Sequence, residues 1–332
     1  MPVKQTDSSP SFDPLIQTEN IAFAGKDLIA CKSCGRLNPP HRLNCLYCGK
    51  GIEFKNENEP LMKPTLRKLE AWENGFNVIV RENAQIEIVT IAQFLSMEPI
   101  DLRSILDTES PLPLARVESE TEASIIRTRL ERCGLESTIV SDGDLAADKL
   151  PVRLSGIDFH DGRMGLKHFN TGETVEVASG DLALIVPGML TVSRVDSFEK
   201  KRRRGNTKLV GETATSSDES VLDIYDNKNS IGFRVHLTGF DFSCLGDDKG
   251  LLAVENLRLL IVRLKEHAPN ARLVTNYLSV KQALSHVWEI ESRKDSQGLM
   301  RSGFGKREFG SVASSSNLNQ FTKYSRLQWH LL

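Results

Sequence analysis

Four cysteines grouped in a short stretch constrain this chain more than any other feature. Cys31 and Cys34 form one C-x-x-C pair, and Cys45 and Cys48 form a second pair after ten intervening residues. A spacer of two residues lets both thiolates of a pair face one metal ion from a tight turn. A glycine follows each pair directly, and glycine tolerates the positive φ that such a turn requires. The spacing therefore predicts one metal site with four thiolate ligands.

Zinc is the metal that we expect at this site, because four thiolates close a tetrahedral shell around it. A closed shell leaves no position for a catalytic water, so we expect one structural Zn²⁺; the alternative is four unligated thiols. His41 lies between the two pairs and is expected to be an exposed loop residue rather than a ligand. A module this short cannot bury enough apolar surface to fold without a metal. The stretch resembles a four-cysteine zinc ribbon, which we place at residues 28–54.

Composition limits the class of protein. The chain has 332 residues, enough for two or three domains, and 39% of them are hydrophobic, which indicates that some segments are disordered. The net charge of −2 argues against a general nucleic-acid binder. No long apolar run or secretory leader is visible, and cysteines arranged for metal suit a reducing compartment. We therefore expect a cytoplasmic protein without a transmembrane segment.

Residues 64–145 show the alternation of a small β-α-α-β-α-β domain. F-N-V-I-V at 76–80 is a predicted strand, and E-T-E-A-S-I-I-R-T-R-L-E-R-C-G-L-E-S-T-I-V at 120–140 is a predicted helix and strand. These stretches, with a two-helix hairpin between them, resemble the C-terminal domain of the bacterial ribosomal stalk protein. The Clp-protease adaptor shares that fold, and the resemblance implies a domain that binds other proteins. Arg81-Glu82-Asn83 replaces the adaptor's Asn-Asp pair, so only the fold is carried over.

Residues 150–290 form a predicted β-rich domain. Short alternating strands are separated by turn sequences such as Pro187-Gly188, and a helix at 251–268 follows them. Strands closed by a helix resemble a pleckstrin-homology-like split barrel. Together with the first two modules, this predicts a multidomain α+β chain.

Three polar segments are expected to be flexible. They are a leader at 1–27, an insert at 199–220 and a tail at 291–332, all rich in small and polar residues. The last six residues, L-Q-W-H-L-L, are an apolar segment that could dock on the chain itself or on a partner.

A dense basic run lies inside the predicted insert, at Lys200-Lys201-Arg202-Arg203-Arg204. Such a cluster attracts phosphate groups, so it could bind nucleic acid or make a peripheral contact with anionic lipid. The alternative is a solvated loop whose charge is balanced by nearby acidic residues.

The sequence contains no local catalytic motif. His160 with Asp158 and Asp161 sits where a strand meets an Asp-Gly turn, and turn chemistry accounts for it. We therefore expect a zinc-binding, non-enzymatic adaptor or scaffold that binds other proteins through small modular domains. The alternative is a nucleic-acid-associated regulator that uses the zinc ribbon and the basic run. A third hypothesis is an enzyme whose site is assembled from residues far apart in sequence.

Overall fold

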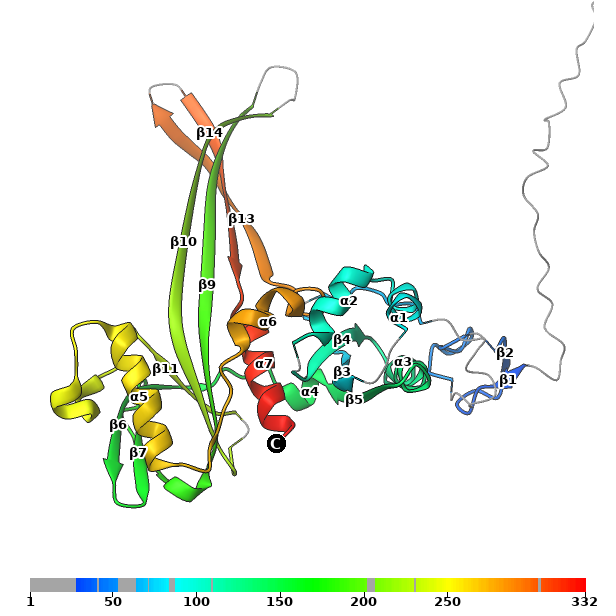
Figure 1. The fold of residues 1–332 in the computed structure, drawn as a ribbon. Helices are drawn as coiled ribbons and strands as arrows, with labels where there is room; N and C mark the ends of the chain where they lie inside the picture. The colour runs from blue at the N-terminus through cyan, green and yellow to red at the C-terminus, as the bar shows by residue number, and fades with distance from the viewer. Residues whose placement is uncertain are drawn as a thin grey trace, which may run out of the picture. The chain divides into compact units, whose positions relative to one another are not determined.

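The structure is mixed α+β, and the chain divides into two units, residues 1–63 and 64–332 (Figure 1). The computed structural model describes residues 28–40, 42–52, 64–70, 72–83, 87–108, 110–201, 207–229, 231–303 and 306–332. The leader expected at 1–27 lies outside the described residues. The domains expected at 64–145 and 150–290 both fall within the second unit.

The first unit is built on a two-stranded antiparallel sheet. β1 (Ile29–Ala30) pairs with β2 (Leu37–Asn38), and an isolated bridge joins Asn44 to Gly51. Its small core consists of Ile52 and two of the cysteines, with Ile29 packed against them. Few apolar side chains are buried in the described part of this unit, so its core alone supplies little stability.

A three-stranded antiparallel sheet in the order β4-β3-β5 opens the second unit. The elements are β3 (Phe76–Asn83), α1 (Ile88–Phe94), α2 (Pro99–Leu106), β4 (Leu112–Val117), α3 (Glu120–Arg132), β5 (Leu135–Ser141) and the short α4 (Asp142–Leu145). From β3 to β5 these elements follow the order β-α-α-β-α-β. Helix α3 begins where expected because the Ser119 side chain accepts a hydrogen bond from the backbone N–H of Glu122.

A curled, nine-stranded half-barrel sheet makes up most of the remainder. Its order is β13-β14-β9-β10-β11-β6-β7-β8, with β12 beside β9. The strands are β6 (Val152–His160), β7 (Arg163–His168), β8 (Thr174–Ala178), β9 (Leu182–Lys201), β10 (Thr207–Asp226), β11 (Phe233–His236), β12 (Arg272–Leu273), β13 (Glu291–Gly303) and β14 (Lys306–Ser316). The helices are α5 (Ala253–His267), α6 (Tyr277–Leu284) and α7 (Leu318–His330). Within the described ranges, no helix combines the length and the apolar character needed to cross a membrane.

The structure corrects two expectations of flexibility. In the insert expected at 199–220, residues 199–201 end β9 and residues 207–220 belong to β10, and these two strands pair with each other. The tail expected at 291–332 contains β13, β14 and α7. The segment is rich in serine, which suggested a flexible tail. A strand that is exposed to solvent needs few hydrophobic side chains, so such a sequence can still form one. The prediction that the apolar C-terminus could dock on its own chain is confirmed, since Leu327 is fully buried.

A second correction concerns Pro187-Gly188, which was expected to be a turn. Both residues lie inside the continuous strand β9, opposite Leu222 and Val221 of β10. Among the described residues, no strand pairs with β9 on its other side at this level, and proline is tolerated at such an edge position. Gly188 is needed because a Cβ atom at this position would lie 2.2 Å from the ring of Phe321 in α7.

We expect Gly188→Ala to destabilise the second unit by about 1–3 kcal/mol, the usual cost of overpacking a core. The added methyl group would force the Phe321 ring away from β9. Chemical denaturation of the full chain measures this cost. Combining Gly188→Ala with Phe321→Leu should cost less than the sum of the two single changes, and a strictly additive result would contradict the contact.

Helix α7 is the most deeply buried helix segment of the C-terminal half and carries many polar residues. Arg234 of β11 forms a two-pronged ion pair with Asp223 of β10, at 2.6 and 2.7 Å, and also donates to the Thr322 hydroxyl of α7. The Arg326 guanidinium donates to the carbonyls of Leu145 and Ala146, at the end of α4. These bonds tie α7 to the large sheet on one side and to α4 on the other.

Asp142 is a second polar junction. Its carboxylate accepts hydrogen bonds from the Gly75 backbone N–H at 2.9 Å, the Asn77 amide at 3.0 Å and the Arg116 Nε at 2.8 Å. Lys323 of α7 also reaches it, at 3.2 Å. The carboxylate therefore joins the three-stranded sheet to α7.

The charge of Asp142 should make this junction sensitive to acid. Burial raises the pKa of the carboxyl, but Lys323, Asn77 and Arg116 outweigh that effect and hold the pKa below its ordinary value of 3.8. Lys323 has the largest of these lowering effects, although burial lowers the pKa of Lys323 itself. A depressed pKa contributes stability above the unfolded value, and that stability is lost as the pH falls through the folded value.

We therefore expect the unfolding free energy of wild type to fall more steeply below pH 4 than that of Asp142→Asn, as measured by urea denaturation across pH. At neutral pH the variant should already be less stable, because Arg116 and Lys323 lose their counter-charge. If the free energy of unfolding changed with pH in the same way in both proteins, ionisation of Asp142 would not contribute to stability.

Candidate metal centre

The four cysteines are presented by two turns of the same design. The Gly35 N–H donates to the Cys31 carbonyl at 2.7 Å, and the Gly49 N–H donates to the Cys45 carbonyl at 3.0 Å. Both glycines have positive φ, +71° and +72°, and nothing lies within 4 Å of the position a Cβ would take. Glycine is therefore required here by backbone conformation rather than by space.

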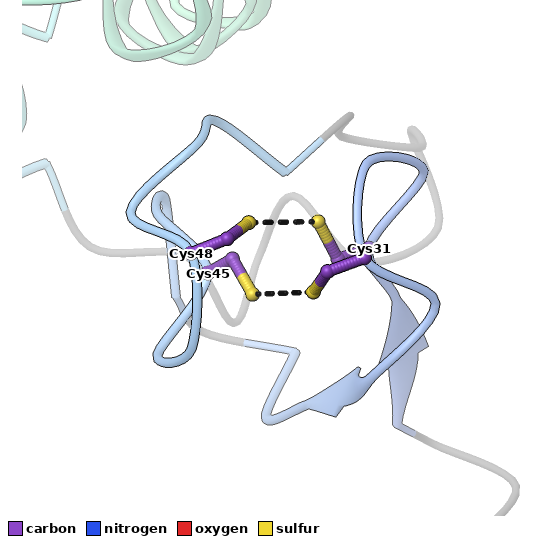
Figure 2. Close-up of side chains that lie close together, drawn as sticks. Cys31, Cys45 and Cys48 are labelled. Carbon is purple, nitrogen blue, oxygen red and sulfur yellow. Dashed lines mark hydrogen bonds between the residues drawn. The ribbon is translucent and has the colours of Figure 1, made fainter.

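The two turns face each other and bring all four sulfurs together (Figure 2). The Sγ atoms of Cys31 and Cys48 lie 3.6 Å apart, and those of Cys34 and Cys45 lie 3.5 Å apart. The four sulfurs are all within 4.8 Å of one another. This cluster could hold a metal ion, as the sequence predicted.

Backbone N–H groups and neighbouring thiols set the charge of the cluster. Burial disfavours ionisation of Cys45, but the backbone N–H groups of Tyr47 and Cys48 and the Asn38 amide outweigh it and lower its pKa to about 6. Hydrogen bonds from the backbone at Cys34 and Ser33 lower the pKa of Cys31. At Cys34 the backbone at Arg36 favours the thiolate, but burial and the other thiols together raise the pKa to about 11.

The shifts differ in sign because the thiols interact with one another: the pKa is lowered at Cys31 and Cys45 and raised at Cys34. A metal ion at the centre would favour four thiolates. The donor set is therefore suited to a cation that prefers soft sulfur ligands.

Asn38 supports the cluster and was missed by the sequence analysis. Its side chain is fully buried; the amide nitrogen donates to the Cys45 sulfur at 3.4 Å, and the amide oxygen accepts from the Leu46 N–H at 2.8 Å. The residue thus links the end of β2 to the second cysteine turn. A polar side chain between two ligand pairs was the available indication, but sequence spacing alone does not show that it is buried.

The other residues singled out by sequence do not join this site. Lys200 and Lys201 end strand β9, with side chains outside the described part of the structure, and Arg202-Arg203-Arg204 are outside it entirely, as is His41. In the part of the chain that the structure describes, the four cysteines form the one His, Cys, Asp or Glu group with metal-binding spacing. Asp158, His160 and Asp161 therefore do not assemble into such a group.

Comparison with models of known families, with curated proteins and with solved structures finds no match to this chain. Function must therefore be argued from the chemistry of the site and its surroundings.

Proposed function

We propose that the cluster binds one structural Zn²⁺ and that this chain is a non-enzymatic adaptor or scaffold that binds other proteins. A zinc–sulfur distance of about 2.3 Å in a tetrahedron implies sulfurs about 3.8 Å apart. The observed separations of 3.5 and 3.6 Å are close to that value. Four protein ligands would complete the shell, and a complete shell holds a fold together rather than activating water.

The surface of the cysteine module is the observation that supports binding to other proteins. Leu37, Leu46 and Tyr47 are 51%, 52% and 54% exposed, although the whole module buries very few apolar side chains. The Arg36 guanidinium lies over the Tyr47 ring at 4.7 Å, and the Asn38–Leu46 hydrogen bond brings β2 beside the second turn. Exposed aromatic and aliphatic side chains next to an arginine are typical of a protein-binding surface.

We call Arg36, Leu37, Leu46 and Tyr47 the knuckle patch. Leu46 and Tyr47 stand between the two cysteines of one pair, so metal binding would fix the patch without using its side chains. In this proposal the metal orders the loops and the patch recognises the partner. The resemblance of residues 64–145 to a protein-binding fold supports the same class of function, and the cytoplasm is the proposed location.

The experiment compares three forms of the full chain in partner capture: wild type, Leu46→Ala with Tyr47→Ala, and all four cysteines changed to serine. We expect the patch variant to retain one zinc per chain and to lose the captured protein. The cysteine variant should lose both. Leu278→Ala, which truncates an exposed leucine of the second unit, is a matched control that should change neither.

Retention of the partner by the patch variant would contradict recognition through the knuckle patch. Capture of nucleic acid in place of protein, weakening steeply between low and physiological salt, would favour the regulator that uses the ribbon and the basic run. If all three forms captured the same proteins, the cysteine module would have a structural role only and would not bind the partner.

A further inference from the structure

Four strands form an arm that extends away from the rest of the second unit (Figure 1). The arm consists of residues 191–201 of β9, 207–220 of β10, 291–303 of β13 and 306–316 of β14. Among the described residues, β13 pairs with β14 alone, and the arm portion of β10 pairs with β9 alone. Each outer strand therefore presents unpaired backbone donors and acceptors along one side.

The outer strands of the arm are open to solvent. Residues 212–218 of β10 and 292–297 of β13 are all exposed. Small and polar side chains are frequent in the arm, and the side chains described there form no continuous apolar layer of the kind that usually stabilises a sheet. Pairing of its edges is the obvious way in which such an arm can gain further stability.

The two edges carry opposite charges. Lys294 of β13 forms no ion pair with any residue that the structure describes, whereas Arg293 and Asp295 beside it pair with each other at 2.9 Å. On β10, Glu212 and Asp218 are exposed and likewise have no ion-pair partner in the described ranges. The β13 edge thus offers a cation and the β10 edge offers anions.

These charges also share one face of the sheet. One row of Cα partners crosses the arm from edge to edge and consists of Lys294, Ala313, Val195 and Ala214. The row two residues closer to the tip contains Ser296 at one edge and Glu212 at the other. Since side chains alternate between faces along a strand, rows two residues apart lie on the same face.

The strand directions allow the edges of two copies to pair. All neighbours in the arm are antiparallel, so the directions alternate across four strands, and β13 and β10 run in opposite directions. If β13 of one copy lies beside β10 of the next copy, with both tips on the same side, the new pair is also antiparallel. In level register Lys294 is then diagonal to Glu212, a separation that a long side chain can span.

We propose that the arm is a self-assembly element in which β13 of one copy pairs with β10 of a second copy. The contact is heterologous, so it propagates from copy to copy and forms a ring if the rotation closes. A two-fold dimer through one edge alone would instead oppose β10 to β10 or β13 to β13, placing like charges together. Charge therefore selects the heterologous contact over the two-fold one.

The irregularities of the edges limit where the pairing occurs. The register shifts between Leu209 and Gly211 on β10 and between Ser296 and Gly298 on β13. Bulges twist an edge away from a partner strand. The contact is therefore confined to the regular segments nearer the base, residues 212–220 and 291–296.

Charge exchange tests this proposal on the full chain. We expect wild type to sediment as a multi-copy species that grows with concentration. Lys294→Glu and Glu212→Lys should each weaken assembly by roughly tenfold or more, because each places like charges across the contact. The double variant Lys294→Glu with Glu212→Lys should restore assembly, which no effect on folding alone would do.

Arg258→Glu is the matched control, since Arg258 is exposed on α5 outside the arm, and it should leave assembly unchanged. Circular dichroism establishes that each variant is folded. A wild-type chain that stays monomeric at every accessible concentration would overturn the proposal. So would a species limited to two copies, assembly indifferent to the single charge reversals, or an extended peptide of another protein bound along β13.

Discussion

Replacing Cys31 and Cys45 with serine should unfold residues 28–52 while the second unit keeps its own thermal transition. Among the described residues of the first unit, the buried apolar side chains are Leu43, Ile52, Cys31 and Cys45, with Ile29 partly buried beside them. Little apolar surface is therefore buried apart from the cysteines themselves. Structural zinc in modules of this size contributes about 10–16 kcal/mol of apparent binding free energy at neutral pH, and this is also the folding free energy. No change outside the four cysteines of the first unit should have so large an effect.

Heteronuclear NMR of the full chain measures this effect directly. The resonances of residues 28–52 should collapse to random-coil positions in the variant, and the same change should follow addition of a strong chelator to wild type. Cys133→Ser and Cys244→Ser are matched controls, because these thiols lie outside the cluster. Dispersed resonances for the first unit in the metal-free chain would contradict a metal-dependent fold.

Asp223→Ala should destabilise the second unit by about 3–5 kcal/mol, the usual cost of removing one partner from a buried ion pair. The change leaves the Arg234 guanidinium, 2% exposed, without its counter-charge. Arg234 also donates a hydrogen bond to the Thr322 hydroxyl at 3.2 Å and lies over the Phe321 ring. A displaced Arg234 side chain should therefore weaken the packing of α7 against the sheet. Urea denaturation, followed by tryptophan fluorescence, gives the free energy of unfolding.

The double variant Asp223→Leu with Arg234→Met separates charge burial from packing. Replacing both partners with apolar residues removes the unpaired charge, so the double variant should be more stable than Asp223→Ala. A double variant that is less stable than the single one would indicate that the pair is needed for shape rather than for charge balance.

The middle of the chain was the most predictable part of the fold. The strand at 76–80 and the helix with the following strand at 120–140 have strong local patterns, with a serine cap before the helix and Gly134 after it. Local periodicity and capping chemistry determine such elements, so a sequence can show them directly. The helix expected at 251–268 also appears, as α5.

The arm and α7 could not be predicted because long-range pairing determines them. The Ser-rich stretch 311–316 resembles a linker in composition, but it belongs to β14, an inner strand of the four-stranded arm. Likewise, Pro187-Gly188 has the composition of a turn, yet Phe321, more than a hundred residues later, requires Gly188 within a strand. Local rules fail where the deciding neighbour lies far along the chain.

The cysteine cluster was predictable because its chemistry lies in the spacing itself. All four predicted ligands meet at one point. Asn38 was not predicted, because its role depends on the fold of the two turns around it. The knuckle patch was not predicted either, because spacing does not show which side chains between the cysteines are exposed.

Metal content and coordination of the purified full chain test the central claim most directly. Elemental analysis with X-ray absorption at the zinc edge should find one zinc per chain with four sulfur ligands at about 2.3 Å. A chain that binds no metal, or whose zinc has fewer than four sulfur ligands, would contradict a closed structural site formed by Cys31, Cys34, Cys45 and Cys48.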